Sequence, residues 1–118
     1  MFLNLPHKRM DVYLAARELL VECRKATDTL PGDEKYVLQS QIRRAALSVL
    51  LNIAEGASRK STAERRRFYE IARSSVVEID AGFDAAATAG YLQEKDMDKL
   101  GSLIIRTFKM LSNLMNNT

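Results

Sequence analysis

Residues 44–53, Arg44-Ala45-Ala46-Leu47-Ser48-Val49-Leu50-Leu51-Asn52-Ile53, form an apolar run with polar side chains at regular intervals. At about 100° per residue, a helix through this region gathers its polar groups into a stripe of roughly 80°. Nearly all its other positions are apolar, so the helix needs packing partners on several sides. Polar groups enclosed there must be hydrogen-bonded, because burying an unpaired one is costly. We call this set the polar stripe, and its members on the helix are Gln41, Arg44, Ser48, Asn52 and Glu55.

Two interpretations of the polar stripe are open. Its charged and amide groups either line a pocket or channel, or belong to a hydrogen-bonded network that fixes helix register or subunit pairing, and we favour the network. Arg44 and Glu55 lie roughly 16 Å apart along one helix, at about 1.5 Å per residue, so they do not pair directly. Glu78 is therefore a candidate partner for Arg44 from another helix, and we include it in the polar stripe. Arg59 follows Glu55 at the i,i+4 spacing that favours an ion pair.

The composition indicates one globular domain over residues 1–118. Apolar residues make up 47% and charged residues 28% of the chain, which excludes a disordered protein. A chain of this length buries roughly two thirds of its unfolded surface but is too short for two independent cores. Helix-forming residues dominate, and no alternating apolar run stands between hairpin turn signals, so we predict an all-α fold.

Helical periodicity and helix-breaking residues predict four helices, over about residues 7–28, 33–58, 61–89 and 94–116. Four helices of similar length with short connections favour an antiparallel, up-down four-helix bundle. The third helix is expected to bury Phe68, Ile71, Ala72, Ser75, Ile79, Gly82, Phe83 and Ala86, and the fourth Met97, Leu100, Ile104, Phe108, Leu111 and Met115.

Local signals mark the helix ends. Asp33 is expected to cap the second helix by accepting a hydrogen bond from its first turn. Ser61 and Glu64 have the spacing of a capping box, in which Ser61 bonds forward and Glu64 bonds back. Gly90 is free to adopt the left-handed conformation that ends the third helix. Within that helix, Gly82 is a predicted point of close contact with a neighbour.

Some apolar side chains lie off the main buried faces of the second and fourth helices. A four-helix bundle covers one face of each helix, so identical copies of the chain would cover the remainder, and we expect a homo-oligomer. The alternative is that these residues simply widen the core. The predicted oligomer interface consists of Leu47, Leu51, Leu103, Met110 and Leu114.

Residues 59–67 carry five cations and one anion across a loop and the start of a helix. Cations at a helix N-terminus oppose the helix dipole, so this arrangement calls for a counter-charge. Phosphate would serve, because a helix start offers free N–H groups and arginine offers forked donors. The alternative is a solvated charged surface. The predicted contacts for RNA or DNA backbone are Arg59, Lys60, Arg65, Arg66 and Arg67, with Arg73 extending the basic face.

Catalytic, metal and cofactor sites find little support in the sequence. The chain has one cysteine, Cys23, and one histidine, His7, so we expect no disulfide, no metal site and no cofactor. No nucleophile has a recognisable base beside it and no glycine-rich phosphate loop occurs, so we do not expect an enzyme. The N-terminus lacks the pattern of a secretory signal, and no long apolar run suggests a membrane span, so we expect a cytoplasmic protein.

Two short motifs carry a family resemblance. Residues 41–48, Gln41-Ile42-Arg43-Arg44-Ala45-Ala46-Leu47-Ser48, are followed by Asn52-Ile53-Ala54-Glu55-Gly56. This pattern resembles the signature of the four-helix-bundle proteins related to those encoded in 23S rRNA intervening sequences, and the similarity covers essentially the whole chain. Further matches are Phe68, Ile71-Ala72, Ser75, Glu78 and Gly90-Tyr91-Leu92.

The resemblance implies a four-helix bundle similar to known homopentameric barrels, whose biochemical role is mostly unassigned. Some members are labelled ribosomal proteins because of where they are encoded, and we do not adopt that label as a function. Other members are accessory proteins of diversity-generating retroelements, basic barrels thought to bind nucleic acid and a reverse transcriptase.

Two functions are therefore expected as alternatives. The first is a non-enzymatic, homo-oligomeric module that binds RNA or DNA backbone through the basic run. Such binding would tolerate many sequences, because no recognition-helix pattern or base-reading code is present. The second is a protein-interaction scaffold, for example for a reverse transcriptase or another acidic partner, with no direct role in nucleic-acid binding.

Overall fold

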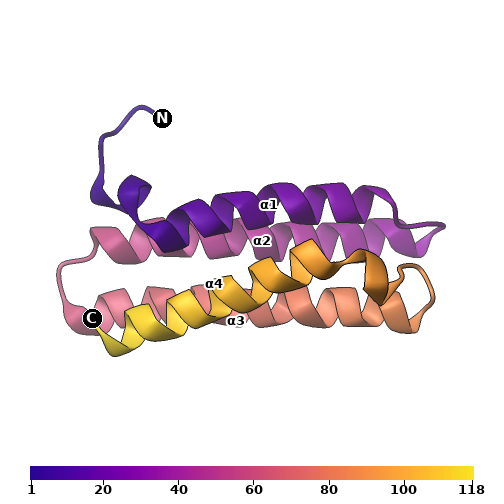
Figure 1. Cartoon of the computed structure of the whole chain (residues 1–118). Coiled ribbons are helices and arrows are strands. Elements are labelled where there is room, and N and C mark those ends of the chain that lie inside the picture. The colour runs from indigo at the N-terminus through magenta and orange to yellow at the C-terminus, as the bar shows by residue number, and fades with distance from the viewer.

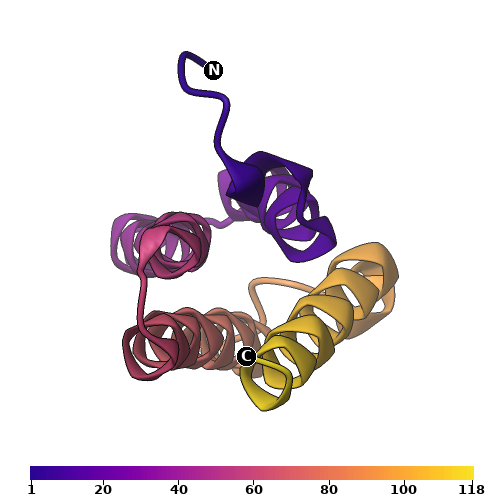
Figure 2. The same ribbon diagram turned by 90° about the vertical axis from the view of Figure 1, so that its left-hand side faces the viewer.

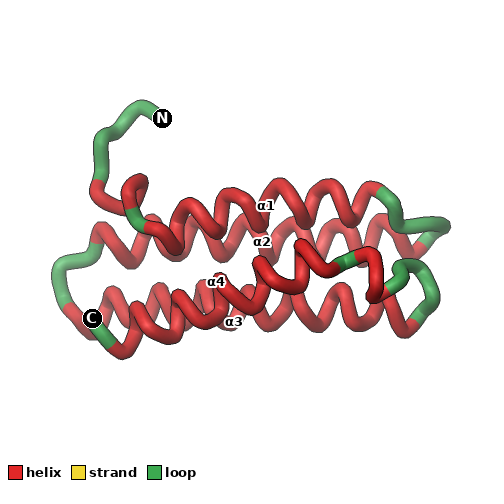
Figure 3. The backbone as a smooth tube through the Cα atoms, in the orientation of Figure 1, coloured by secondary structure: helices red, strands yellow, loops and turns green.

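The predicted helices run alternately up and down along one long axis (Figure 1). The computed structural model describes residues 1–118 apart from the side chain of Glu34. Loops and turns lie at the N-terminus and at the ends of the bundle, which leaves the helices uninterrupted along its sides (Figure 3). The elements in chain order are η1 (Pro6–Arg9), α1 (Asp11–Asp28), α2 (Glu34–Ser58), α3 (Thr62–Thr88), η2 (Glu94–Asp96) and α4 (Asp98–Asn116).

Viewed from one end, the helices occupy the corners of a quadrilateral (Figure 2). Helix α1 packs against α2 and α4, and α3 packs against the same two helices from the opposite side. The molecule measures 45 × 29 × 21 Å, and its length matches helices of this size at about 1.5 Å per residue. The all-α, up-down four-helix bundle predicted from the sequence is confirmed. None of the described helices is long and apolar enough to cross a bilayer.

The core follows the apolar stripes of all four helices. Each stripe repeats at intervals of three and four residues, which places its members on one side of a helix. The largest fully buried side chains come from every helix, so one continuous core holds the bundle together. These residues are Leu19, Cys23, Thr27, Ile42, Val49, Ile53, Val76, Ile79, Thr107 and Leu111.

Two glycines allow α2 and α3 to pack closely. A Cβ atom on Gly82 would lie 2.6 Å from Cγ1 of Ile42, which confirms Gly82 as a contact point. At the other end of the same helix pair, a Cβ atom on Gly56 would lie 2.7 Å from the ring of Tyr69. Both distances are shorter than real Cβ contacts, so these positions exclude any larger side chain without movement of a neighbour.

The ends of α3 agree largely with the sequence signals. The backbone N–H of Glu64 donates to Ser61 Oγ at 3.1 Å, which confirms the forward half of the capping box. The Glu64 carboxylate instead faces Arg59, at 3.9 Å, and no return bond to Ser61 is present among the described residues. Gly90 has φ +80°, and the N–H of Tyr91 reaches back to the carbonyl of Ala86 at 2.9 Å. This is the left-handed helix end that was predicted.

The prediction that the Asp33 side chain caps α2 was wrong. Asp33 already has helical dihedral angles, and its side chain makes no capping hydrogen bond within the described part of the chain. The N–H of Lys35 instead donates to the carbonyl of Gly32 at 3.2 Å. Because the backbone of Asp33 is helical rather than extended, its carboxylate is not positioned to accept from the free N–H groups of the first turn.

The first predicted helix is divided in two. Met10 has an extended backbone, with ψ 132°, and separates η1 from α1. Pro6 starts η1, where its fixed φ and missing N–H are tolerated. His7 is buried and its ring meets the Tyr13 ring edge-on, with centroids 4.7 Å apart. The break therefore lets η1 fold back against the start of α1.

Candidate functional site

The basic run lies at one end of the bundle, where α2 ends, α3 begins and the last turn of α4 arrives (Figure 1). The antiparallel order of the helices brings these three helix ends together. The C-terminal ends of α2 and α4 carry unpaired carbonyl groups and the negative ends of their helix dipoles. Cations that oppose the dipole of α3 therefore have favourable partners on the two neighbouring helices.

Arg65 bonds to the junction between α2 and α3. Its Nη1 atom donates to the carbonyl of Arg59 at 3.1 Å and to the carbonyl of Lys60 at 2.7 Å. Its Nη2 atom donates to Thr62 Oγ1 at 3.2 Å. The guanidinium thus fixes the loop that follows α2 and is half-buried by it.

Arg66 bonds to the end of α4. Its Nε atom donates to the carbonyl of Met115 at 3.1 Å, and Nη2 donates to the carbonyl of Thr118 at 3.3 Å. A cation on the last carbonyls of a helix satisfies their hydrogen-bonding capacity and the helix dipole together. The counter-charge that the sequence called for is therefore supplied within the chain, at least for Arg65 and Arg66.

Arg59 and Arg73 also have partners within the chain. Arg59 pairs with Glu55 at 2.9 Å, as its spacing predicted, and its Cζ lies 4.8 Å from the centre of the Phe68 ring. The Nε atom of Arg59 is buried and has no hydrogen-bond partner among the described residues. Arg73, on α3, donates from Nη1 to Oγ of Ser112, on α4, at 3.2 Å. Neither guanidinium is free to reorient without losing these contacts.

Lys60 and Arg67 are the exposed cations of the run that make no hydrogen bond or ion pair to any described residue. Lys60 sits in the loop before α3, and Arg67 lies in the first turns of α3, at the rim of a groove between α2 and α3. The six predicted phosphate contacts therefore divide into four with structural contacts and two that are free. The sequence did not distinguish them, because the carbonyls that receive Arg66 come from a segment about fifty residues away.

Four members of the polar stripe, Gln41, Arg44, Ser48 and Glu78, line a groove of about 630 Å³ between α2 and α3. At its base, Ser75 Oγ donates to Ser48 Oγ at 2.8 Å. The Asn52 amide donates to the carbonyl and to Oγ of Ser48, at 2.8 and 3.0 Å. The groove is lined by Gln41, Arg44, Ala45, Ser48, Arg67, Glu70, Ile71, Ser74, Ser75 and Glu78.

The polar stripe contains both a hydrogen-bonded network and side chains that line a groove, the two arrangements considered from the sequence. Ser48 and Asn52 are half-buried and form the hydrogen-bonded network, whereas Gln41, Arg44 and Glu55 are exposed at its edge. Arg44 and Glu78 line the same groove, but the described side chains form no ion pair between these two positions. The expectation that α2 is enclosed on nearly all sides does not hold for a single chain, because Leu47 and Leu51 on its outer side are exposed.

The predicted oligomer interface separates into exposed and internal residues. Leu47 and Leu51 are 45% and 56% exposed on the outer side of α2. Leu103 is only 4% exposed, so its assignment to the interface was wrong: it packs within the core of its own chain. Met110 and Leu114 are partly buried against the same core. On α4 the apolar stripe is wide because the helix packs against both α1 and α3.

Two residues expected in the core lie at its margin. Ile71 and Phe108 are each 38% exposed. Ile71 borders the groove between α2 and α3, and Phe108 borders a second hollow between α3 and α4. The periodicity placed them at the edges of their apolar stripes, and the spacing between the helices leaves those edges open.

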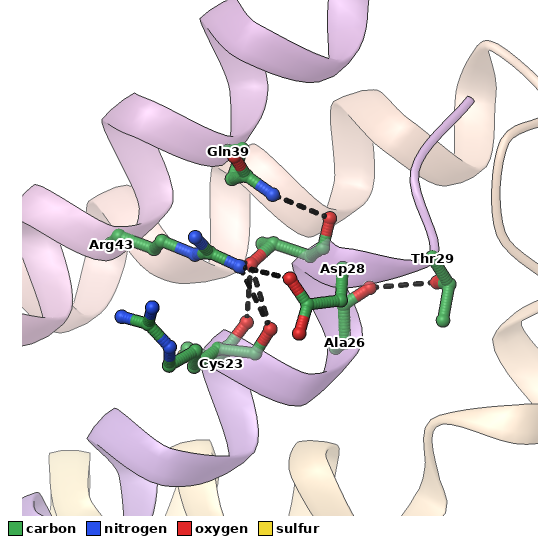
Figure 4. Close-up of polar contacts among 8 residues, drawn as sticks. Cys23, Ala26, Asp28, Thr29, Gln39 and Arg43 are labelled. Carbon is green, nitrogen blue, oxygen red and sulfur yellow. Dashed lines mark hydrogen bonds and ion pairs between the residues drawn. The ribbon is translucent and has the colours of Figure 1, made fainter. Parts of the chain in front are cut away.

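Arg43 has a structural role that was not predicted from the sequence. Its guanidinium donates to Thr27 Oγ1 at 2.9 Å, to the carbonyl of Arg24 at 3.2 Å and to the Asp28 carboxylate at 2.6 Å (Figure 4). Gln39 adds a bond from its amide to the carbonyl of Thr27 at 3.2 Å. The signal was a cation on the flank of α2 that meets the last turn of α1, where the dipole favours positive charge.

Two reactive side chains are held in the interior. Burial raises the pKa of the Cys23 thiol to about 12, so it is not a nucleophile at neutral pH. Burial also raises the pKa of the Tyr69 phenol, and its ring packs on Gly56. Tyr69 is therefore a packing residue at the contact between α2 and α3.

The fold and the site define a class: an up-down four-helix bundle whose basic helix junction is held by arginine contacts to helix ends. Residues 8–113 match the model of the 23S rRNA-intervening sequence protein, and the chain belongs to that family. The resemblance seen in the Asn-Ile-Ala-Glu-Gly motif is thereby confirmed. A comparison with curated protein sequences finds no match.

A solved structure has the same fold. It is a protein of unknown function from the S23 ribosomal protein family of Bacteroides thetaiotaomicron, with a TM-score of 0.80 and 20% sequence identity. The match covers 88% of this chain and 97% of that one. At this identity the likeness establishes the bundle architecture.

Proposed function

We propose that the protein is a non-enzymatic, cytoplasmic module that binds the backbone of RNA or DNA through the basic end of its bundle. The observation that carries the proposal is the gathering of the cations of residues 59–67 at the junction of α2, α3 and α4. Lys60 and Arg67 would contact phosphate directly, because they have no partner among the described residues. Arg59, Arg65, Arg66 and Arg73 would add positive potential while keeping their structural contacts.

Several copies of the chain would present this end together. Leu47 and Leu51 leave an apolar surface on α2 that nothing in the single chain covers. Val77 and Ile105 leave a second apolar surface between α3 and α4. Two different surfaces on one molecule suit a head-to-tail contact, which closes into a ring when the rotation between copies permits. A homopentamer, as the family resemblance implies, is the ring that we propose.

Salt dependence of binding tests the nucleic-acid proposal. Each phosphate neutralised by a cation releases a counterion, so affinity for a generic RNA duplex should fall steeply with salt. Lys60→Glu with Arg67→Glu should weaken binding and flatten the salt slope by about two phosphate contacts. Lys35→Glu with Lys95→Glu, which alters charge at the opposite end of the bundle, is the matched control. Equal affinities for the two double variants would refute the proposal.

The groove between α2 and α3 favours a second candidate function, a protein-interaction scaffold. Its rim carries both signs of charge, with Arg44 and Arg67 beside Glu70 and Glu78. Acidic side chains repel a phosphate backbone but complement the mixed charges of a protein surface. Capture of partners before and after nuclease treatment separates the two functions: a partner that survives digestion supports the scaffold, and one that is lost supports nucleic acid.

A further inference from the structure

The strongest unexplained feature outside the basic end is an apolar hollow on the side of the bundle formed by α3 and α4. It has a volume of about 230 Å³, and Val77, Ile105 and Phe108 leave much of their surface open to it. It shares Asp80, Ile104 and Ile105 with a larger hollow of about 380 Å³ toward the start of α4. The two hollows therefore make one continuous groove, which we call the α3–α4 groove.

The far part of the α3–α4 groove is acidic. Asp80, Asp84, Glu94 and Asp98 line it, and these carboxylates form no ion pair with any described side chain. A suitable occupant therefore has apolar side chains for one part of the groove and positive charge for the other. The groove is long enough for a short segment of extended chain rather than a single side chain.

The same molecule carries a segment of this chemistry at its N-terminus. Residues 1–5 stand away from the bundle (Figures 1 and 2). Phe2 is 92% and Leu3 is 65% exposed, and two cations, Lys8 and Arg9, follow within η1. We call residues 1–5 the N-terminal arm.

The arm has a defined attachment to its own chain. Lys8 donates from Nζ to the carbonyl of Leu3, and Arg9 donates from Nη1 to Asn4 Oδ1 at 3.2 Å. His7 anchors the following turn, because its ring is buried against Tyr13. The apolar side chains of the arm are thus presented outward by a turn that is itself fixed to the bundle.

The arm cannot fill the groove of its own chain while η1 remains docked. In both views the arm lies beyond α1, on the side of the bundle away from α3 (Figures 1 and 2). A second copy has no such restriction. Val77 to Asp84 spans about 10 Å along α3 at about 1.5 Å per residue, and four extended residues cover about 13 Å at about 3.3 Å each.

We propose that the N-terminal arm of one copy docks in the α3–α4 groove of a second copy. Phe2 and Leu3 would cover the apolar part beside Val77, Ile105 and Phe108, and Lys8 and Arg9 would face the carboxylates around Asp80. The contact joins different surfaces of the two copies, so it can be repeated from copy to copy around a ring. This inference rests on the assembly part of the proposed function and adds a named segment, the N-terminal arm, to the contact made at the α3–α4 surface.

Cysteine cross-linking between two differently sized versions of the full chain tests the docking. One version carries Phe2→Cys and the other Ile105→Cys, and the two are co-expressed, purified together and mildly oxidised. A covalent heterodimer should form roughly tenfold or more faster than with Leu14→Cys in place of Ile105→Cys, because docking gives a high effective concentration. Leu14 is a suitable control since it is also exposed but lies on α1, outside the groove.

The outcomes separate the inference from the assembly proposal. Equal cross-linking with Ile105→Cys and Leu14→Cys in an oligomeric protein would overturn the docking and leave the assembly standing. A monomer by light scattering at all concentrations would overturn both. As a second measurement, Phe2→Ser with Leu3→Ser should lower the mean mass of the assembly, and an unchanged mass would contradict the inference. These arm residues are exposed, so the substitutions leave the core of each chain intact.

Discussion

The Arg66 guanidinium donates from Nε to the main-chain carbonyl of Met115 at 3.1 Å and so joins the first turns of α3 to the last turn of α4. The two residues are far apart in the sequence and meet only because the helices are antiparallel. The contact gives Arg66 a structural role at the end of the bundle, in addition to the positive potential that it contributes there.

Replacing Arg66 by Ala should therefore reduce stability. We expect a loss of about 0.5–1 kcal/mol, modest because the carbonyls at this exposed helix end can bond to water instead. Urea unfolding followed by circular dichroism measures the change. Arg67→Ala, one position further and without a partner among the described residues, is the control and should leave the midpoint nearly unchanged. Equal shifts for both variants would contradict the structural role.

Substitution of Arg43 should lower the free energy of unfolding more than substitution of its neighbour Arg44. Arg43→Met removes a half-buried cation that bonds to Thr27, to Asp28 and to the end of α1, and we expect a loss of about 1–3 kcal/mol. Arg44→Met changes an exposed side chain at the groove edge and should cost less than about 0.5 kcal/mol. Denaturant midpoints compare the two, and a larger loss for Arg44→Met would show that the contacts in Figure 4 do not govern stability.

Gly82→Ala should destabilise the bundle, because the new Cβ would meet Ile42 at 2.6 Å. We expect a cost of about 1–3 kcal/mol from overpacking, which outweighs the better helix propensity of alanine. In an Ile42→Ala background the obstacle is gone, so the same substitution should become stabilising by up to about 1 kcal/mol. Thermal unfolding of the four combinations measures this reversal of sign.

Gly101→Ala provides the control for the glycine experiment. A Cβ atom on Gly101, within α4, would meet nothing within 4 Å. Its replacement should therefore raise stability by about 0.5–1 kcal/mol through helix propensity alone. If Gly82→Ala stabilised the protein by the same amount, the close packing of α2 on α3 would be refuted.

Stability should fall on acidification through the titration of His7. Burial, with a contribution from Lys8, lowers the pKa of His7 below its ordinary value near 6.5. The unfolded chain then binds the proton more readily than the folded one, so stability is complete above about pH 6.5 and declines as the pH falls below it. Melting temperatures between pH 5 and 8 measure the decline. His7→Gln should flatten it, and an identical profile in this variant would assign the decline to other groups.

Assembly should depend on the exposed leucines of α2. Leu51→Glu places a charge on a side chain that is 56% exposed in the single chain, so folding should be retained while an apolar contact between copies is lost. Light scattering should report a smaller species than for the unsubstituted protein. Ser40→Glu, an exposed polar position on the same helix, should keep the original mass. If Leu51→Glu assembled like the control, α2 would not be part of an interface.

The parts of the fold that depend on residues close together in the chain could be predicted from the sequence. Ser61 caps α3 and Gly90 ends it, because each effect follows from one residue and its local backbone. Gly82 meets α2 because a glycine on the buried face of a helix lets a neighbouring helix come close. The four-helix bundle could also be predicted, because the apolar stripe of each helix is a local pattern in the sequence. Asp33 failed as a cap since its backbone takes helical dihedral angles instead of the extended ones of a capping residue, a local difference that sequence patterns do not resolve.

The candidate site depended on contacts between distant segments and was only partly predictable. The basic run was found, but the partners of Arg65 and Arg66 come from the ends of α2 and α4, which the sequence does not place. Leu103 was assigned to the oligomer interface because it lies outside the main apolar face of its helix. In the structure α4 packs against both α1 and α3, so Leu103 is buried in the core. Pairwise helix packing, rather than periodicity, decides such residues.

The buried thiol of Cys23 makes the protein its own conformational reporter. A reagent that alkylates sulfhydryl groups reaches this atom only when the helices separate, and the chain contains no other cysteine. The rate of Cys23 alkylation therefore measures how often the interior opens, in the unsubstituted protein and in each variant, and no second cysteine has to be introduced. Where alkylation is faster than reclosing, that rate gives the lifetime of the closed bundle, and where it is slower, the rate gives the population of the open form.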